Sequence, residues 1–224
     1  MTRRQILFFV KFPEPGKVKT RLARSLGDKT AARLYAAFVD DMINMLQKTR
    51  TPVAVHFAPP EMQQAMRRWM GPAMPLVSQS GADLGERMHT AFAHAFTLGV
   101  DQAVLLGSDL PDLPHQNIEA AFKALDSHDC ALAPAGDGGY HLIGCNRDSY
   151  SPTVFQNITW STPQVFAQTM QRMDEAGLSC ARLREWPDID TMDDLNHFRE
   201  RLRQHLDHGR SIVPATFSIL NEIF

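Results

Sequence analysis

The chain has 224 residues, 44% of them hydrophobic, and its 23 Lys plus Arg against 25 Asp plus Glu give a formal net charge of -2. This length allows a substantial buried core, and the balanced charge argues against nucleic acid or an anionic membrane as the main partner. Three widely spaced cysteines without a CxxC pair argue against a disulfide framework and a structural zinc site, and favour a reducing compartment. Only five apolar residues precede Lys11, with no cleavage site, and no stretch is long enough to span a bilayer. We therefore expect a soluble, cytoplasmic protein.

Strand and helix patterns alternate along the chain without a Ser/Gly-rich linker, which predicts one α/β domain over residues 1–224. Apolar runs predict buried strands at 6–10, 52–57, 75–78, 103–106 and 130–133. Helical spacing of apolar residues predicts helices at 28–48, 61–70, 84–96, about 114–126, from 163 onward and from 191 to about 206. Asp40 and Asp41 are expected to face solvent. The expected architecture is a Rossmann-like, mostly parallel central sheet with helices on both faces.

Residues 207–224 are expected to form a C-terminal extension. Its tail, 212–224, alternates apolar and polar residues. This pattern indicates packing against the body of the protein or against a partner subunit, and the second case would make a homodimer.

The first strand leads directly into a basic loop at 11–22. Two prolines, Pro13 and Pro15, and Gly16 shape this loop. The loop contains four cationic residues and one hydroxyl donor: Lys11, Lys17, Lys19, Arg21 and Thr20. Such groups hold a phosphate chain by charge-assisted hydrogen bonds. The Gly-Lys-Ser/Thr order of a Walker A loop is absent, and a solvated basic loop is the alternative interpretation.

The strand at 103–106 ends at Gly107, and Asp109 follows directly before Pro111 and Pro114. These prolines prevent the strand from continuing. In open α/β sheets, ligands bind at the carboxyl edge of the strands, so Asp109 is a candidate ligand for a divalent cation. Capping of the next helix by Asp109 is the alternative.

Two further polar turns precede helices or strands. In the turn at 79–88, Gln79 offers hydrogen bonds, Arg87 could reach a phosphate, and Asp83 is either a helix cap or a ligand. The stretch Gly136-Asp137-Gly138-Gly139 is typical of a tight hairpin, and it also lets a substrate approach the backbone. Asp137 and Tyr140 could then bind a hydroxyl group. The hairpin and the binding loop are compatible.

The last part of the chain contains a predicted helix start and a second group of carboxylates. Ser161 or Thr162 is expected to cap a helix with Pro163 in its first turn. The preceding Trp160 either seals the core or stacks on a ring. Asp188 and Asp190 lie on one face of an extended segment, before a capping-box-like start at 191–194. Because Asp188 and Asp190 lie before that helix start, they could come close to Asp109 in the folded chain.

Six motifs in this order resemble one bacterial family across nearly the whole chain: KFPEPGKVKTRL, QSGADLGERM, GSDLPDL, PAGDGGYHLIG, WST and DIDTMDDL. This family is described as selenodomain-associated or arsenosugar-biosynthesis-type glycosyltransferases. It belongs to the nucleotide-diphospho-sugar transferase superfamily of GT-A fold. The layout is also similar to that of nucleotidylyltransferases such as the guanylyltransferases.

The resemblance implies a nucleotide bound over the carboxyl ends of the sheet, together with a small-molecule acceptor. It implies Mg2+ or Mn2+ held by Asp109 with Asp190 or Asp188. The chain carries Gly-Ser-Asp-Leu-Pro where many such glycosyltransferases carry Asp-x-Asp. The candidate catalytic residues are Asp109 and Asp137. The candidate nucleotide- and phosphate-binding residues are Lys11, Pro15, Gly16, Lys17, Lys19, Thr20, Arg21, Gln79, Arg87 and Ser108, and the candidate acceptor-binding residues are Gly138, Gly139 and Tyr140.

Three functions fit these residues. The first is a metal-dependent glycosyltransferase that uses a nucleotide-diphospho-sugar donor, with Asp137 as base. The second is a nucleotidylyltransferase that couples a nucleoside triphosphate to a phosphorylated acceptor and releases pyrophosphate. The third is a non-catalytic nucleotide-binding protein. The fold does not decide among them.

Overall fold

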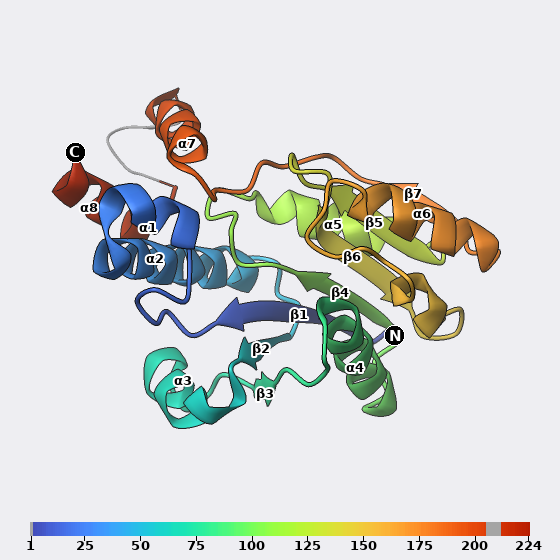
Figure 1. Ribbon diagram of the computed structural model, residues 1–224. Helices are drawn as coiled ribbons and strands as arrows, with labels where there is room; N and C mark the ends of the chain where they lie inside the picture. The colour runs from blue at the N-terminus through green and yellow to red at the C-terminus, as the bar shows by residue number, and fades with distance from the viewer. Residues whose placement is uncertain (1, 205–211) are drawn as a thin grey trace.

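The computed structural model describes residues 2–204 and 212–224. Within them, seven strands form one sheet in the order β3-β2-β1-β4-β6-β5-β7 (Figure 1). The strands are β1 (Arg4–Lys11), β2 (Val53–Ala58), β3 (Leu76–Ser78), β4 (Gln102–Leu106), β5 (Cys130–Pro134), β6 (Tyr140–Asn146) and β7 (Cys180–Arg182). β1 pairs in parallel with β2 and β4, whereas β6 runs antiparallel between β4 and β5. The predicted mostly parallel α/β sheet is confirmed.

Eight α-helices flank this sheet in the described residues (Figure 1). They are α1 (Thr20–Leu26), α2 (Asp28–Gln47), α3 (Gln63–Met70), α4 (Leu84–Thr97), α5 (His115–Ala124), α6 (Val165–Glu175), α7 (Met192–Gln204) and α8 (Pro214–Ile223). Short 3-10 turns lie at Pro60–Met62 and Pro152–Phe155. None of the helices in the described ranges is both long and apolar enough to cross a membrane.

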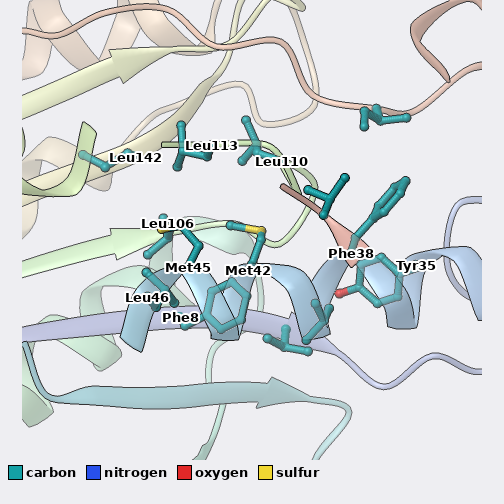
Figure 2. Packing of buried hydrophobic residues seen from close by; sticks show 14 of the residues in the cluster. Phe8, Tyr35, Phe38, Met42, Met45, Leu46, Leu106, Leu110, Leu113 and Leu142 are labelled. Atoms are coloured by element: carbon teal, nitrogen blue, oxygen red, sulfur yellow. The ribbon is translucent and has the colours of Figure 1, made fainter. Parts of the chain in front are cut away.

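The core lies on both faces of the sheet, because successive residues of a strand point to opposite faces. Ile6, Phe8 and Val10 of β1 pack on one face with α2, and Leu7 and Phe9 pack on the other face with α4. Figure 2 shows the first of these clusters, in which Phe8 and Leu106 of the sheet meet Met42 and Leu46 of α2. Such a two-sided core fixes β1 and β4 firmly, and the functional loops extend from their carboxyl ends.

The tail forms helix α8 and packs against the body of the protein, which is one of the two alternatives expected for it. α8 lies against α2, and its first backbone N–H groups, of Ala215 and Thr216, donate to the Asp41 carboxylate at 3.0 and 2.7 Å. The expectation that Asp41 faces solvent is therefore wrong, because Asp41 caps α8 and is buried. Asp40 is also not free in solvent, since it accepts a hydrogen bond from the Trp69 indole. Of the expected C-terminal extension, residues 207–211 lie outside the described residues.

α6 begins later than its sequence indicated. Its first residue is Val165 and its N-cap is Gln164, so neither Ser161 nor Thr162 caps it. Ser161 instead adopts a left-handed backbone conformation, with φ of 63°. Pro163 precedes the helix rather than lying in its first turn. The chain turns here before the helix starts, which leaves Trp160 and Ser161 beside the edge of the sheet where the candidate site lies.

Candidate functional site

The candidate site lies where the carboxyl ends of β1 and β4 are adjacent. β2 and β3 extend the sheet from one side of β1, and β4 continues it on the other side. The helices that follow β1 and β4, α2 and α5, pack in the same cluster on one face of the sheet. The loops that lead to them lie at the carboxyl edge of the sheet, where ligands of open α/β sheets bind. Tyr35 of α2 joins the two loops, because its hydroxyl oxygen accepts from the Lys11 backbone N–H at 3.0 Å and lies 2.7 Å from Ser108 Oγ. Sequence reasoning missed Tyr35, whose position in an apolar helical pattern gave no functional signal.

A basic hollow of about 610 Å³ lies at this edge. Eight of its lining residues belong to the predicted nucleotide- and phosphate-binding set: Lys11, Lys17, Lys19, Thr20, Arg21, Gln79, Arg87 and Ser108. Gln79 and Arg87 are held by backbone carbonyls, since Gln79 Nε2 donates to His56 O and Arg87 Nε donates to Gly81 O. Asp83 caps α4 by accepting from the Glu86 backbone N–H, so the cap alternative for Asp83 is confirmed. Pro15 and Gly16 shape the turn and line neither this hollow nor the one described next.

An acidic hollow of about 380 Å³ adjoins the basic one and shares Asp109 and Asp190 with it. Its carboxylates come from three separate segments: Asp109, Asp137, Asp188 and Asp190. Its other walls are mainly apolar or aromatic and include Phe9, Leu84, Met88, Tyr140 and Trp160. The four aspartates thus gather at one edge of the sheet, as the sequence predicted for Asp109, Asp188 and Asp190.

Backbone hydrogen bonds bring the segment after β7 across the sheet edge to Asp109. Leu183 N donates to Leu132 O, Trp186 N donates to Pro134 O, and Ile189 N donates to Asp109 O. The segment then enters α7 through the predicted capping box, in which Asp194 Oδ2 accepts from the Thr191 backbone N–H at 2.8 Å. Asp188 and Asp190 are therefore placed by the backbone on either side of Ile189, which is buried in the core.

Lys19 joins two of these carboxylates. Its ammonium lies 2.6 Å from Asp109 Oδ1 and 2.6 Å from Asp190 Oδ1, and only 4% of its side chain is exposed. Burial lowers the pKa of Lys19, but the charges of Asp109 and Asp190 outweigh this effect, so the pKa is raised and the amine stays protonated. The backbone of Lys19 is left-handed, with φ of 46°, which few residues other than glycine adopt. The sequence placed Lys19 on the phosphates and did not reveal this contact.

The pKa of Asp188 is raised at this site. Burial, then the charges of Asp190 and Asp137, raise its pKa to about 6, while Lys19 offsets this only in part. A divalent cation would relieve the repulsion, and carboxylate oxygens are the ligands that Mg2+ and Mn2+ prefer. The donor chemistry of Asp109, Asp188 and Asp190 thus fits a metal ion. Among residues 2–204 and 212–224, however, no three His, Cys, Asp or Glu side chains are already arranged around one metal position, and Lys19 is the cation between Asp109 and Asp190.

The hairpin between β5 and β6 supplies the remaining predicted residues. Asp137 accepts from the Gly139 backbone N–H at 2.9 Å, and Gly139 and Tyr140 line the acidic hollow. Gly138 does not face the hollow. It packs against Pro163, where a Cβ atom would overlap the backbone, and its carbonyl accepts from Phe166 N at the start of α6. The Tyr140 hydroxyl lies 3.7 Å from Met88 Sδ, and burial raises the pKa of Tyr140, so the phenol is neutral.

Comparisons with solved structures place this fold among nucleotide-using proteins. A protein from Desulfovibrio desulfuricans G20, described as a "putative nucleotide-diphospho-sugar transferase", is 39% identical and superimposes with a TM-score of 0.91 over 100% of this chain and 97% of that chain. A CMP:2-keto-3-deoxy-manno-octonic acid synthetase in complex with CTP has a TM-score of 0.58 at 12% identity, over 92% of this chain and 100% of that one. Rv0371c of Mycobacterium tuberculosis H37Rv, in complex with manganese, has a TM-score of 0.52 at 14% identity, over 89% and 99%. The last two similarities show the fold alone.

No curated protein matches the chain in sequence. The profile of one family, described as "Uncharacterized protein conserved in bacteria (DUF2064)", matches residues 41–162, a range that includes β4, Asp109 and the hairpin that carries Asp137. Because this match covers more than half of the chain, and because the Desulfovibrio relative is similar over the whole chain, the protein belongs to the DUF2064 family and has the fold of nucleotide-diphospho-sugar transferases.

Proposed function

We propose that this protein is a metal-dependent transferase that uses a nucleotide-diphospho-sugar donor and passes the sugar to a small-molecule acceptor. The observation that carries the proposal is the pair of adjoining hollows, one basic and one acidic, that share Asp109 and Asp190 at the carboxyl edge of the sheet. A nucleotide diphosphate fits the basic hollow, and the transferred group then lies at the boundary between the two. The description of the Desulfovibrio relative supports this donor class.

The reaction breaks the bond between the sugar carbon and the diphosphate oxygen, and forms a bond from the same carbon to an acceptor oxygen. Negative charge grows on the leaving diphosphate, and fixed cations at that point stabilise the transition state more than the ground state. Lys17 and Arg21 line the hollow where this charge develops. Asp137 would take the acceptor proton. A Mg2+ or Mn2+ ion held by Asp109 with Asp190 or Asp188 would add positive charge at the diphosphate.

A second candidate function is nucleotidyl transfer with release of pyrophosphate. Besides Lys19, which binds Asp109 and Asp190, four cationic side chains line the basic hollow: Lys11, Lys17, Arg21 and Arg87. This is more positive charge than a diphosphate needs. The complexes of the fold neighbours with CTP and manganese agree with a nucleotide and a metal in either function. The finer assignment, to the selenodomain-associated or arsenosugar-biosynthesis type, stays a prediction.

The test is a thermal-shift screen of nucleotides and nucleotide sugars with and without Mn2+. A ligand at 100 times its dissociation constant should stabilise the fold by about 2.7 kcal/mol. Lys17→Ala should abolish the shift, whereas Lys29→Ala, an exposed change on α2, should leave it unchanged. The ligand that binds is then assayed for release of nucleoside diphosphate or of pyrophosphate, which separates the two enzymes. Binding without turnover in the wild type would favour a non-catalytic protein, and absence of any binding would refute both enzymes.

A further inference from the structure

The acidic hollow differs in chemistry from the basic hollow beside it. None of the residues that line it, all within the described part of the chain, is Lys or Arg, and four are aspartates. The one ammonium in contact with them, that of Lys19, already binds both Asp109 and Asp190. Among residues 2–204 and 212–224, no lysine or arginine forms an ion pair with Asp137 or Asp188, so both face the hollow without a cationic partner there.

His141 does not change the negative charge of the acidic hollow. It lines the acidic hollow, and its side chain is buried. Its Nδ1 lies 2.9 Å from the Pro134 carbonyl, which can only accept, so Nδ1 carries the proton and Nε2 holds a lone pair. Burial lowers the pKa of His141 to about 4, so the ring is neutral near pH 7. Nε2 is buried and has no hydrogen-bond partner among the described residues, so His141 adds no positive charge to the hollow.

The remaining wall is apolar and aromatic. Leu84 and Met88 come from α4, and Trp160 comes from the turn before α6. The volume of about 380 Å³ lies within the range of small-molecule sites, which combine apolar walls with a few polar groups that fix orientation. A molecule that enters here meets both apolar surface and carboxylates.

We propose that the second substrate, which occupies the acidic hollow, is an uncharged or cationic hydroxyl or amine compound with an apolar face, that Asp109 and Asp190 rather than Asp188 hold the metal ion, and that phosphorylated acceptors are excluded by Asp137 and Asp188. This inference rests on the proposed function, because it assigns the acceptor of that same site. Hydroxyl and amine groups donate to carboxylates. A phosphate group presents only acceptors and negative charge at neutral pH, so it would meet like charges at short range.

The test uses three probes with the same apolar body and different head groups: benzyl alcohol, benzylamine and benzyl phosphate. Binding is followed by the indole N–H signal of Trp160 in a nitrogen-15 NMR spectrum, assigned with Trp160→Phe. We expect the alcohol and the amine to shift this signal, and the amine to bind at least about tenfold more tightly than the phosphate. Asp137→Asn combined with Asp188→Asn should reduce that ratio about fivefold or more. Asp148→Asn, whose side chain is 89% exposed and outside the hollow, should not change it.

The outcomes separate this inference from the proposed function. Benzyl phosphate that shifts Trp160 as strongly as the amine would overturn the inference, even if nucleotides bind. A Trp160 signal that none of the three probes moves would overturn it as well. If the amine is preferred but no nucleotide stabilises the protein with or without Mn2+, the charge preference of the acidic hollow stands and the proposed function fails.

Discussion

Replacement of Asp188 by Asn should stabilise the ligand-free protein at high pH. In the folded chain the pKa of Asp188 is raised to about 6 from its ordinary value of 3.8 by burial and by Asp190 and Asp137. The folded state therefore binds this proton more tightly than the unfolded state, so the contribution of Asp188 to the free energy of unfolding is fully present below pH 4 and is lost as the pH rises through 6. A difference of about 2 pH units corresponds to about 3 kcal/mol, and solvent screening of this partly exposed carboxyl reduces it to about 1 to 2 kcal/mol.

The amide of Asn carries no charge, so Asp188→Asn removes this penalty where Asp188 would be ionised. The expected gain of about 1 to 2 kcal/mol corresponds to a rise in Tm of about 3 to 6 °C for a chain of this size. Thermal unfolding followed by circular dichroism at pH 8 and at pH 4 measures it, with Asp148→Asn as the exposed control. A gain of equal size at both pH values, or no gain at pH 8, would refute the charge-repulsion argument.

Three further substitutions test other parts of the site and fold. Lys19→Met leaves Asp109 and Asp190 without their shared cation and should lower the free energy of unfolding by about 2 to 3 kcal/mol. This is less than for a fully buried pair, because both carboxylates are about 40% exposed. In urea unfolding, the double variant with Asp109→Asn should recover part of the lost stability, and full additivity of the two changes would contradict the contact. Gly138→Ala should destabilise by more than about 1 kcal/mol, because φ is +85° and a Cβ atom would overlap the Pro163 backbone; an unchanged urea midpoint would count against that packing. Asp41→Ala should weaken the cap of α8 by about 1 kcal/mol, seen as faster hydrogen exchange of α8 amides, whereas unchanged exchange would show that the cap is dispensable.

The strands and the position of Asp109 could be predicted because they follow from local patterns. The apolar run 103–106 and the prolines after Asp109 placed this carboxylate at a strand end, where the structure has it. The backbone hydrogen bond from Ile189 N to Asp109 O then brings Asp190 close to it. By contrast, β7 has the sequence Cys-Ala-Arg, which carries no strand pattern, and it forms because its backbone pairs with β5.

The contacts that the sequence did not reveal depend on side chains from distant elements. Nothing local distinguishes Lys19 from Lys17, yet only a left-handed turn at Lys19 directs its amine to Asp109 and Asp190. Asp41 lies on the polar side of a helical pattern and is buried only because α8 covers it. Long-range partners of this kind override local propensity, and single-sequence reasoning cannot rank them.

The antiparallel direction of β6 determines how readily the sequence and length of the turn before it can vary. Because β6 returns antiparallel beside β5, the five residues 135–139 complete the connection, whereas a parallel return would need a crossover of about a dozen residues or more. This short turn holds Asp137 while the paired strands below it hold the sheet. Insertions or exchanges in the turn would alter which second substrate is accepted and leave the loops around β1 intact. Relatives that keep the first basic loop but differ at 135–139 are therefore expected to share a donor and to diverge in what they modify.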